Sequence, residues 1–371
     1  MKICLITNYA SHYHLAKWQL MAETFDIDFV FDSDVSKAKG IKSMDLSQIR
    51  ERVVNVSNFY FGDHMIWQSG VIKLAFKANY NKFIVIDEKT CFSSWILAAI
   101  IFFKKNKKFY WGDGHGWYGR EGFFKRIIKK TAFLVSNGEF VYGNFSKKIM
   151  INNGLRADKI WVVHNSLNYS EQLQFRNNIT NLYKDHFGNE NPVLVFIGRL
   201  IKDKKLGLIL SAMESLRAKG FECNCVLIGD GEMKNELIQE TLRKKLEKDV
   251  WFFGACYSEE EISVLLTNAD LCVSPGSIGL TAIHSMAYGT PVITHNNFPY
   301  QGPEFEAVIP DITGNFFEED NVSSLSNVIF DWFSSFKNRE EIRNNCYLEI
   351  DNGWTPEFKV NIFKKVLINT N

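Results

Sequence analysis

The segment "SPGSIGLTAIHSMAYGTPVITH", which runs from Ser274 to His295, predicts a loop of small residues, a short helix, a glycine stop and a buried strand. Gly289 ends the apolar pattern of the helix, and Pro291 stands just before the strand residues "VIT". The first amides of a helix have no intrahelical acceptors and lie at the positive end of its dipole. The segment therefore predicts an anion site at the start of this helix, formed by Gly279, Leu280 and Thr281.

Length and composition indicate a folded protein of two domains. The chain has 371 residues, more than one hydrophobic core usually organises. Hydrophobic residues make up 46% of it and charged residues 23%, which is typical of globular rather than disordered chains. The formal net charge is +1, so no nucleic-acid partner is expected.

Short β-rich runs alternate with helical patterns, which indicates α/β domains with parallel sheets covered by helices. A turn-rich segment, "GNENP", separates two sets of runs, so we expect two doubly wound, Rossmann-like domains at residues 1–168 and 190–352. A ligand cleft is expected between them, at the carboxyl ends of the strands. The expected strands are "KICLIT", "DIDFVF", "KFIVID", "KKFYWG", "EFVYG" and "KIWVVH", then "PVLVFIG", "CNCVLIG", "VWFFG", "DLCVSP" and "TPVITH".

The C-terminal segment "TPEFKVNIFKKVLINT" predicts a helix with one apolar stripe. Packing on the second domain is the simpler alternative. We expect residues 355–371 to cross back to the first domain instead. The stripe consists of Ile362, Phe363, Val366 and Leu367.

Targeting and redox signals favour a cytoplasmic location. The first residues lack the apolar core and cleavage site of a signal peptide. The longest apolar run, Trp95 to Phe103, has nine residues, whereas crossing a bilayer takes about twenty. Seven scattered cysteines fit reduced thiols, and their spacing does not suggest a metal site. We expect no bound metal.

Two further strand ends carry residues suited to phosphate. Gly198 and Arg199 follow "VLVFI", and Lys204 comes five residues after Arg199, so two cations can face one anion. The alternative is an ordinary strand-end arginine beside solvated lysines. In "LIGDGEMKNEL", Gly231 permits a tight turn before a helix, although an ordinary turn explains it as well.

These segments together resemble a known family, the retaining glycosyltransferases of the GT-B fold, specifically the family 4 type (glycosyl transferases group 1). "FIGRLIKDKKLGLILSAMESL" is similar to its GRLxxxKG segment, with Lys205 where a glycine is usual. "GLTAIHSMAYGTPVI" is similar to its GLxxxEAMAxGxPVI block, and "PEFEAVIPDITGNFF" to a later one. "DKIWVVHNSLN" in the first domain is similar to another family segment, with Ser166 replacing a glycine.

The resemblance implies transfer of a sugar from a nucleotide diphosphate to an acceptor hydroxyl, with retention of configuration. Arg199 and Lys204 would neutralise the leaving diphosphate. No cofactor is implied besides the nucleotide-sugar co-substrate. In the front-face mechanism proposed for such enzymes, a leaving phosphate oxygen takes the acceptor proton, so no protein base is obligatory. The donor-binding residues implied are Gly198, Gly231, Glu232, Gly254, Gly276, Gly279, Leu280, Thr281 and His284.

The chain departs from the family at two positions where glutamates are usual. They read Gly276 and His284 here. The family's first glutamate touches the donor sugar and its second grips the ribose. His284 can still bind ribose or phosphate, or it is an ordinary helix residue. Glu304 and Glu306, on the loop after the next strand, are the hypothetical replacements.

The loop from Lys107 to Gly122, "KKFYWGDGHGWYGREG", is the main candidate for acceptor binding. Its five glycines make the backbone permissive, and its aromatic rings can stack on sugars. His115 stands where family members carry a histidine near the donor sugar, so we expect it to be catalytic. A surface turn histidine is the alternative. The acceptor-binding candidates are Asp113, Trp117, Tyr118 and Arg120 in this loop, with Asn8, His12 and His14 near the N-terminus.

Residues 102–130 contain nine lysines and arginines against two acidic residues. In "GFFKRIIKKTAFLV" apolar pairs recur at helical spacing between the basic residues, as in helices that lie on anionic membranes. A solvated basic face is the alternative. Membrane contact fits a glycan acceptor carried on a lipid diphosphate, as in bacterial surface-polysaccharide assembly.

Three classes of function are compatible with the sequence. A retaining glycosyltransferase is favoured because the cations and the glycine-rich helix start are present. A non-catalytic subunit that binds a nucleotide sugar or a partner enzyme is the alternative that the missing glutamates suggest. A sugar-nucleotide isomerase would need acids that the sequence does not identify.

Overall fold

The computed structural model divides the chain into two compact units. Unit 1 comprises Met1–Asn168 and Pro356–Asn371, and unit 2 comprises Tyr169–Thr355. The described residues are 1–10, 14–34, 44–47, 49–61, 65–76, 79–86, 91–104, 106–112, 114, 123–335 and 338–369.

Unit 1 contains a parallel seven-stranded sheet in the order β3-β2-β1-β6-β7-β8-β9. The chain starts in the middle of this sheet, builds outward to β3, and returns to the other side of β1. The reversal between β1 and β6 is a topological switch point. The strands are β1 (Lys2–Tyr9), β2 (Asp26–Asp32), β3 (Val53–Asn55), β6 (Tyr80–Ile86), β7 (Lys107–Gly112), β8 (Gly138–Val141) and β9 (Ile160–Val162).

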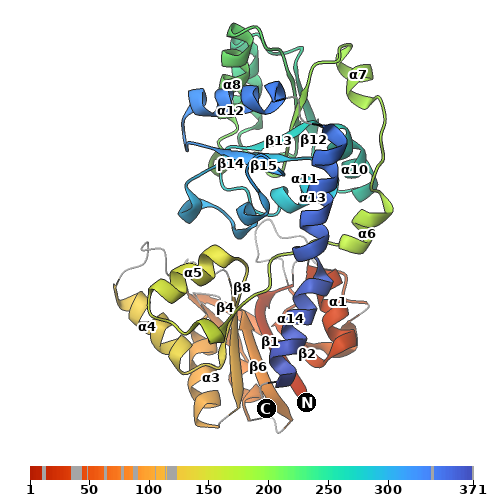
Figure 1. Ribbon diagram of the computed structural model, residues 1–371. Helices are drawn as coiled ribbons and strands as arrows, with labels where there is room; N and C mark the ends of the chain where they lie inside the picture. The colour runs from red at the N-terminus through yellow and green to blue at the C-terminus, as the bar shows by residue number, and fades with distance from the viewer. Residues whose placement is uncertain are drawn as a thin grey trace. The chain divides into compact units, whose positions relative to one another are not determined.

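The helices of unit 1 follow most of these strands, as in other doubly wound folds (Figure 1). They are α1 (Leu15–Thr24), α2 (Val71–Leu74), α3 (Phe92–Phe103), α4 (Phe123–Leu134), α5 (Asn144–Asn152) and α14 (Pro356–Asn369), with short 3₁₀ turns at Arg50–Arg52 and Ala157–Lys159.

An antiparallel hairpin, β4 (Ser57–Phe61) with β5 (Met65–Ser69), interrupts the alternation between β3 and β6. It is anchored to the carboxyl ends of two sheet strands by buried amides. The backbone N–H of Asn58 donates to Asp32 Oδ2 at 2.7 Å, and its side-chain amide donates to the Asn8 carbonyl at 3.1 Å. Gln68 donates to the Thr7 carbonyl at 2.9 Å.

The C-terminal helix α14 packs within unit 1, beside α1 (Figure 1). Phe363 is fully buried between two aromatic rings, with its ring centroid 4.1 Å from Phe140 and 5.1 Å from Trp111. Val366 and Leu367 are buried in the same core cluster, and Ile362 packs against it. The apolar stripe of the tail is therefore covered by the core of unit 1.

Unit 2 contains a parallel six-stranded sheet in the order β12-β11-β10-β13-β14-β15. The switch point lies between β10 and β13, so ligands are expected beyond the carboxyl ends of these two strands. The strands are β10 (Val193–Ile197), β11 (Asn224–Ile228), β12 (Val250–Gly254), β13 (Leu271–Ser274), β14 (Val292–His295) and β15 (Gly314–Phe317).

Helices cover both faces of this sheet, and α8 lies beside α12 (Figure 1). They are α6 (Tyr169–Gln174), α7 (Leu182–Phe187), α8 (Gly207–Ala218), α9 (Lys234–Arg243), α10 (Glu259–Asn268), α11 (Thr281–Ala287), α12 (Val322–Ser334) and α13 (Arg339–Gly353). Short 3₁₀ turns occur at Lys202–Lys204, Phe298–Tyr300 and Pro303–Ala307.

The prediction of two Rossmann-like sheets is confirmed, and each of the eleven expected strands is present. Sequence reasoning missed β3, β15 and the hairpin. The strands β3 and β15 have three and four residues, which is too short for a clear period. Across the described residues, no helix is both long and apolar enough to cross a membrane.

Replacing Phe363 by alanine tests the packing of α14. We expect Phe363→Ala to lower the free energy of unfolding by about 3–5 kcal/mol, because it removes a buried ring and leaves a cavity. Ile368→Ala on the same helix is the control, since Ile368 is 49% exposed, and it should change stability by less than about 1 kcal/mol. Urea unfolding measures both variants; equal effects would contradict the packing described.

Candidate functional site

Main chain packs directly on main chain at the carboxyl edge of the sheet in unit 2. The Gly229 N–H, after β11, donates to the Gly254 carbonyl at 2.7 Å. The Gly198 N–H, after β10, donates to the Ile228 carbonyl at 2.9 Å. A Cβ atom on Gly229 would lie 1.9 Å from the Gly198 carbonyl oxygen. No side chain fits at that distance, so glycine at this position brings the loops after β10, β11 and β12 together.

Two cations lie beside one another after β10. Arg199 is exposed, and among the described residues its side chain has no hydrogen-bond or ion-pair partner. Lys204 is half-buried, and its Nζ donates to the Ser277 carbonyl at 2.5 Å. Burial lowers the Lys204 pKa, and the nearby Arg199 charge lowers it further, while Glu304 and Asp203 oppose the shift. Two positive charges near the switch point can therefore hold a doubly charged anion.

Gly276 supports the loop that carries Lys204. Its N–H donates to the Lys204 carbonyl at 3.1 Å, and the residue is buried. A Cβ atom here would lie 2.0 Å from the Asp203 carbonyl oxygen. A glutamate at this position would therefore displace the loop, which gives the glycine a structural reason within this chain.

The start of α11 offers backbone N–H groups. Gly279 has a φ of +56°, with open space where its Cβ would be. The Thr281 hydroxyl donates to the carbonyl of Ile197 at 2.9 Å, so β10 fixes the helix start. The N–H groups of Gly279 and Leu280 have no acceptor in the described part of the chain. They remain available for oxygen atoms of a ligand.

Glu304 lies near Lys204. It is 2% exposed, on the 3₁₀ turn at Pro303–Ala307, and its charge raises the Lys204 pKa. Glu306 is half-buried on the same turn. On the neighbouring loops, Glu232 is exposed and Gly231 is half-buried, with its N–H bound to Asp230 Oδ1 at 2.7 Å.

His284 is engaged by a carboxylate that sequence reasoning did not single out. Its Nε2 lies 2.9 Å from Glu259 Oε1, and the Tyr288 hydroxyl donates to the same oxygen at 2.7 Å. Burial alone would raise the Glu259 pKa, but contacts with His284, Tyr288 and Gln172 lower it overall. Glu259 is the first residue of α10 and lies 25 residues before His284 in the sequence, so only the fold brings the two side chains together. The signal was the run "SEEE" at a helix start.

Of the candidate residues predicted in unit 1, the structure describes Asn8 and His14. Asn8 is buried at the end of β1, and its carbonyl accepts from Asn58. His14 precedes α1, with its ring centroid 5.5 Å from that of Trp18. The remaining candidates lie outside the described residues: His12, Asp113, His115, Trp117, Tyr118 and Arg120.

In unit 2 the structure thus places Lys204 where the charges of Arg199 and Glu304 act on it, with Gly276 and Ser277 against the same loop. Thr281 is held at the end of β10 by its hydrogen bond to the Ile197 carbonyl. Within the described residues, no three His, Cys, Asp or Glu side chains gather in a way that could hold a metal ion.

Comparisons with known proteins show which families and structures the chain resembles. The family model "Glycosyl transferases group 1" matches residues 180–348. An "Uncharacterized 41.2 kDa protein in cps region" of Klebsiella pneumoniae is 25% identical over 304 residues, which cover 73% of this chain and 79% of that protein. The "Capsular polysaccharide biosynthesis glycosyltransferase CapM" of Staphylococcus aureus is 22% identical over 64% of this chain and 63% of its own.

Among solved structures, Anabaena Alr3699/HepE in complex with UDP superposes with a TM-score of 0.75 at 17% identity, over 99% of this chain and 100% of that chain. The two sheets and this likeness define the class: the chain has the GT-B fold of glycosyltransferases. The match to the glycosyl transferases group 1 model, residues 180–348, lies within its second unit.

Gly229→Ala tests the close approach of the loops. We expect it to destabilise the protein by about 3 kcal/mol or more, because the new Cβ forces the backbone of Gly198 to move. Gly220→Ala is the matched control: its φ is also positive, +79°, but its Cβ would meet nothing within 4 Å. That variant should lose only about 1–2 kcal/mol of left-handed strain. Similar losses of stability on thermal unfolding would show that the approach is not tight.

Proposed function

We propose that the chain is a retaining glycosyltransferase that moves a sugar from a nucleotide diphosphate to a hydroxyl of a glycan or lipid-linked glycan. One observation carries the proposal: Arg199 follows β10, and Lys204 is bonded to the Ser277 carbonyl after β13, so both cations lie at the switch point of unit 2. The match of residues 180–348 to the glycosyl transferases group 1 model supports it. Relatives in capsular polysaccharide biosynthesis favour a role in surface-polysaccharide assembly.

The proposed chemistry needs stabilisation of a leaving group more than a protein base. As the bond from the anomeric carbon to the diphosphate oxygen breaks, negative charge grows on that diphosphate. Arg199 and Lys204 oppose this charge, and the Gly279 and Leu280 amides bind its oxygens. The acceptor oxygen bonds to the anomeric carbon on the same face, and its proton passes to the leaving phosphate. In this scheme no metal and no cofactor takes part.

The donor's other contacts follow from the same loops. We assign the base and ribose to the neighbourhood of Gly231, Glu232 and Gly254. His284 keeps Nδ1 for the ribose because its Nε2 faces Glu259. Glu304, which is buried near Lys204, is the proposed contact to the sugar in place of a residue at position 276.

The acceptor and membrane parts of the proposal concern unit 1. We assign the acceptor to the loop around His115 and to Asn8 and His14 near the N-terminus. The α4 helix carries basic residues between apolar ones, and Ile127 and Leu134 on it are 46% and 56% exposed. These features support contact with an anionic membrane from the cytoplasmic side.

A non-catalytic subunit that binds a nucleotide sugar is the second candidate. The engagement of His284 by Glu259 favours it, because the ribose grip typical of the family is altered. Turnover separates the two functions, since a non-catalytic subunit would bind the nucleotide sugar without cleaving it.

Arg199→Ala tests the leaving-group assignment. UDP, GDP and ADP are screened by thermal shift. The sugar donor that carries the nucleotide found to bind is then assayed for slow hydrolysis without acceptor. We expect one diphosphate to raise the melting temperature of the wild type. Arg199→Ala should lower the hydrolysis rate by about 10²–10³-fold, as loss of one charge-stabilising donor does in other enzymes.

Lys202→Ala is the control for this experiment. Lys202 is an exposed lysine on the same turn, and its loss should leave the rate within about twofold, since exposed charges contribute little. An equal loss in both variants would mean that only the general charge of the loop matters. Tight binding with no hydrolysis by the wild type would favour the subunit.

Charge reversal on α4 tests the membrane assignment. We expect the wild type to sediment with vesicles that contain anionic phosphatidylglycerol, and to be released as salt screens the attraction. A triple variant with Lys→Glu at 125, 129 and 130 should lose binding by about tenfold or more. Binding that salt does not weaken, or no binding at all, would contradict the assignment.

A further inference from the structure

Lys205 occupies a backbone conformation that lysine rarely adopts. Its φ is +51°, in the left-handed region, where the Cβ atom crowds the backbone. Its Nζ lies 2.8 Å from Glu319 Oε1 and 2.7 Å from Asp320 Oδ1. Asp320 also has a positive φ, +60°. Two strained turns are thus joined by ion pairs, which indicates that the pairing offsets the strain.

Glu319 is itself held at the carboxyl end of β14. Its other oxygen accepts a hydrogen bond from the Asn297 side chain at 2.5 Å. The Asn297 N–H donates to Nδ1 of His295, which is 1% exposed, at 3.2 Å, and His295 Nε2 lies 4.0 Å from Glu319. The partner of Lys205 therefore has a fixed position.

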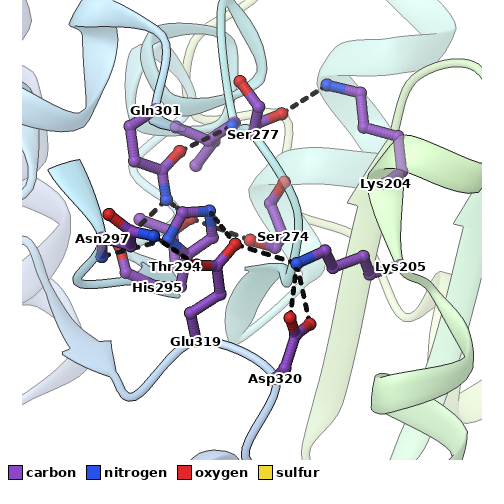
Figure 2. Close-up of polar contacts among 11 residues, drawn as sticks. Lys204, Lys205, Ser274, Ser277, Thr294, His295, Asn297, Gln301, Glu319 and Asp320 are labelled. Atoms are coloured by element: carbon purple, nitrogen blue, oxygen red, sulfur yellow. Dashed lines mark hydrogen bonds and ion pairs between the residues drawn. The ribbon is translucent and has the colours of Figure 1, made fainter. Parts of the chain in front are cut away.

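A second chain of contacts runs from β14 back to Lys204. The buried side chain of Gln301 donates to the His295 carbonyl at 2.9 Å and to Thr294 Oγ1 at 2.8 Å. Its oxygen accepts from the Ile278 N–H at 2.9 Å. Ile278 follows Ser277, whose carbonyl accepts from Lys204 Nζ. Figure 2 shows these contacts. They form a ring, because Lys204 and Lys205 are neighbours joined by a peptide bond.

We propose that Lys205 is a positioning residue: by pairing with Glu319 and Asp320 it holds the 202–205 turn so that Lys204 is fixed before a ligand arrives. The turn is then held on two sides, by Gly276 and Ser277 on one and by the segment after β15 on the other. A cation held in place need not be reorganised when charge develops beside it. The consequence for transfer rests on the proposed function, whereas the clamping of the turn does not.

Amide hydrogen exchange tests the clamp without any substrate. The reporters are the N–H groups of Lys204, Lys205 and Gly276, which donate to Ile201, Lys202 and Lys204 carbonyls. We expect Lys205→Gly to speed exchange at these amides by about tenfold or more, because the turn opens locally more often. Glu319→Gln should also speed exchange at these amides, although it leaves residue 205 a lysine. Lys205→Arg keeps a cation at this position and should keep exchange as slow as in the wild type.

Lys245→Gly is the matched control. Lys245 is an exposed lysine of unit 2 with a φ of +54°, and among the described residues its side chain has no hydrogen bond or ion pair. Its replacement relieves the same strain and should leave the three reporter amides unchanged. Unchanged exchange in Lys205→Gly or in Glu319→Gln overturns the inference.

Nucleotide binding then tests what the clamp is for. Titration of wild type and variants with UDP, GDP and ADP is compared with the matching monophosphates. We expect Lys205→Gly to weaken binding of the preferred diphosphate by about tenfold and of its monophosphate by less, because the proposed function assigns Lys204 to the diphosphate's second phosphate. No diphosphate binding by the wild type overturns the proposed function and leaves the exchange result to decide the clamp. Binding by the wild type with equal affinity in Lys205→Gly overturns the positioning role alone.

Discussion

Direct packing of main chain on main chain at the carboxyl edge of unit 2 is the constraint on which the candidate site depends. The loops after β10 and β11 approach so closely that a Cβ atom on Gly229 would clash with the Gly198 carbonyl. The 202–205 turn approaches Gly276 in the same way. Backbone contacts of this kind fix loop positions without side-chain freedom, so the cations that the loops carry have defined places.

The two departures from the family pattern have different physical causes. Gly276 is enclosed by the turn that carries Lys204, so a long side chain at that position is incompatible with this arrangement. His284 is half-buried and paired with Glu259, so a carboxylate is present, but it comes from α10 and contacts the His284 ring. The first change concerns packing, and the second redistributes charge. Both leave the Gly279 and Leu280 amides open.

Much of the fold could be predicted from the sequence, because buried parallel strands are short apolar runs bounded by glycine and proline. The placement of Arg199 and Lys204 at a strand end was accessible for the same reason. The pairing of Glu259 with His284, and of Lys205 with Glu319, was not, since each joins segments 25 and 114 residues apart. Contacts over such separations come from the order of strands in the sheet, which a local pattern does not contain. The hairpin β4–β5 was missed because its exposed aromatic residues, Phe59 to Phe61, hide the alternation expected of a strand.

The most direct measurement is a titration of isotope-labelled protein with UDP, GDP and ADP, followed by NMR of the backbone amides. If unit 2 holds the diphosphate of a sugar donor, one of the three should shift the Gly279 and Leu280 amides strongly at saturation, together with those of Arg199 and Lys204. The Arg199→Ala variant should show the same shifts only at higher concentration. Absence of any shift at these four amides with all three nucleotides, in a protein that is folded, would contradict the assignment of the site.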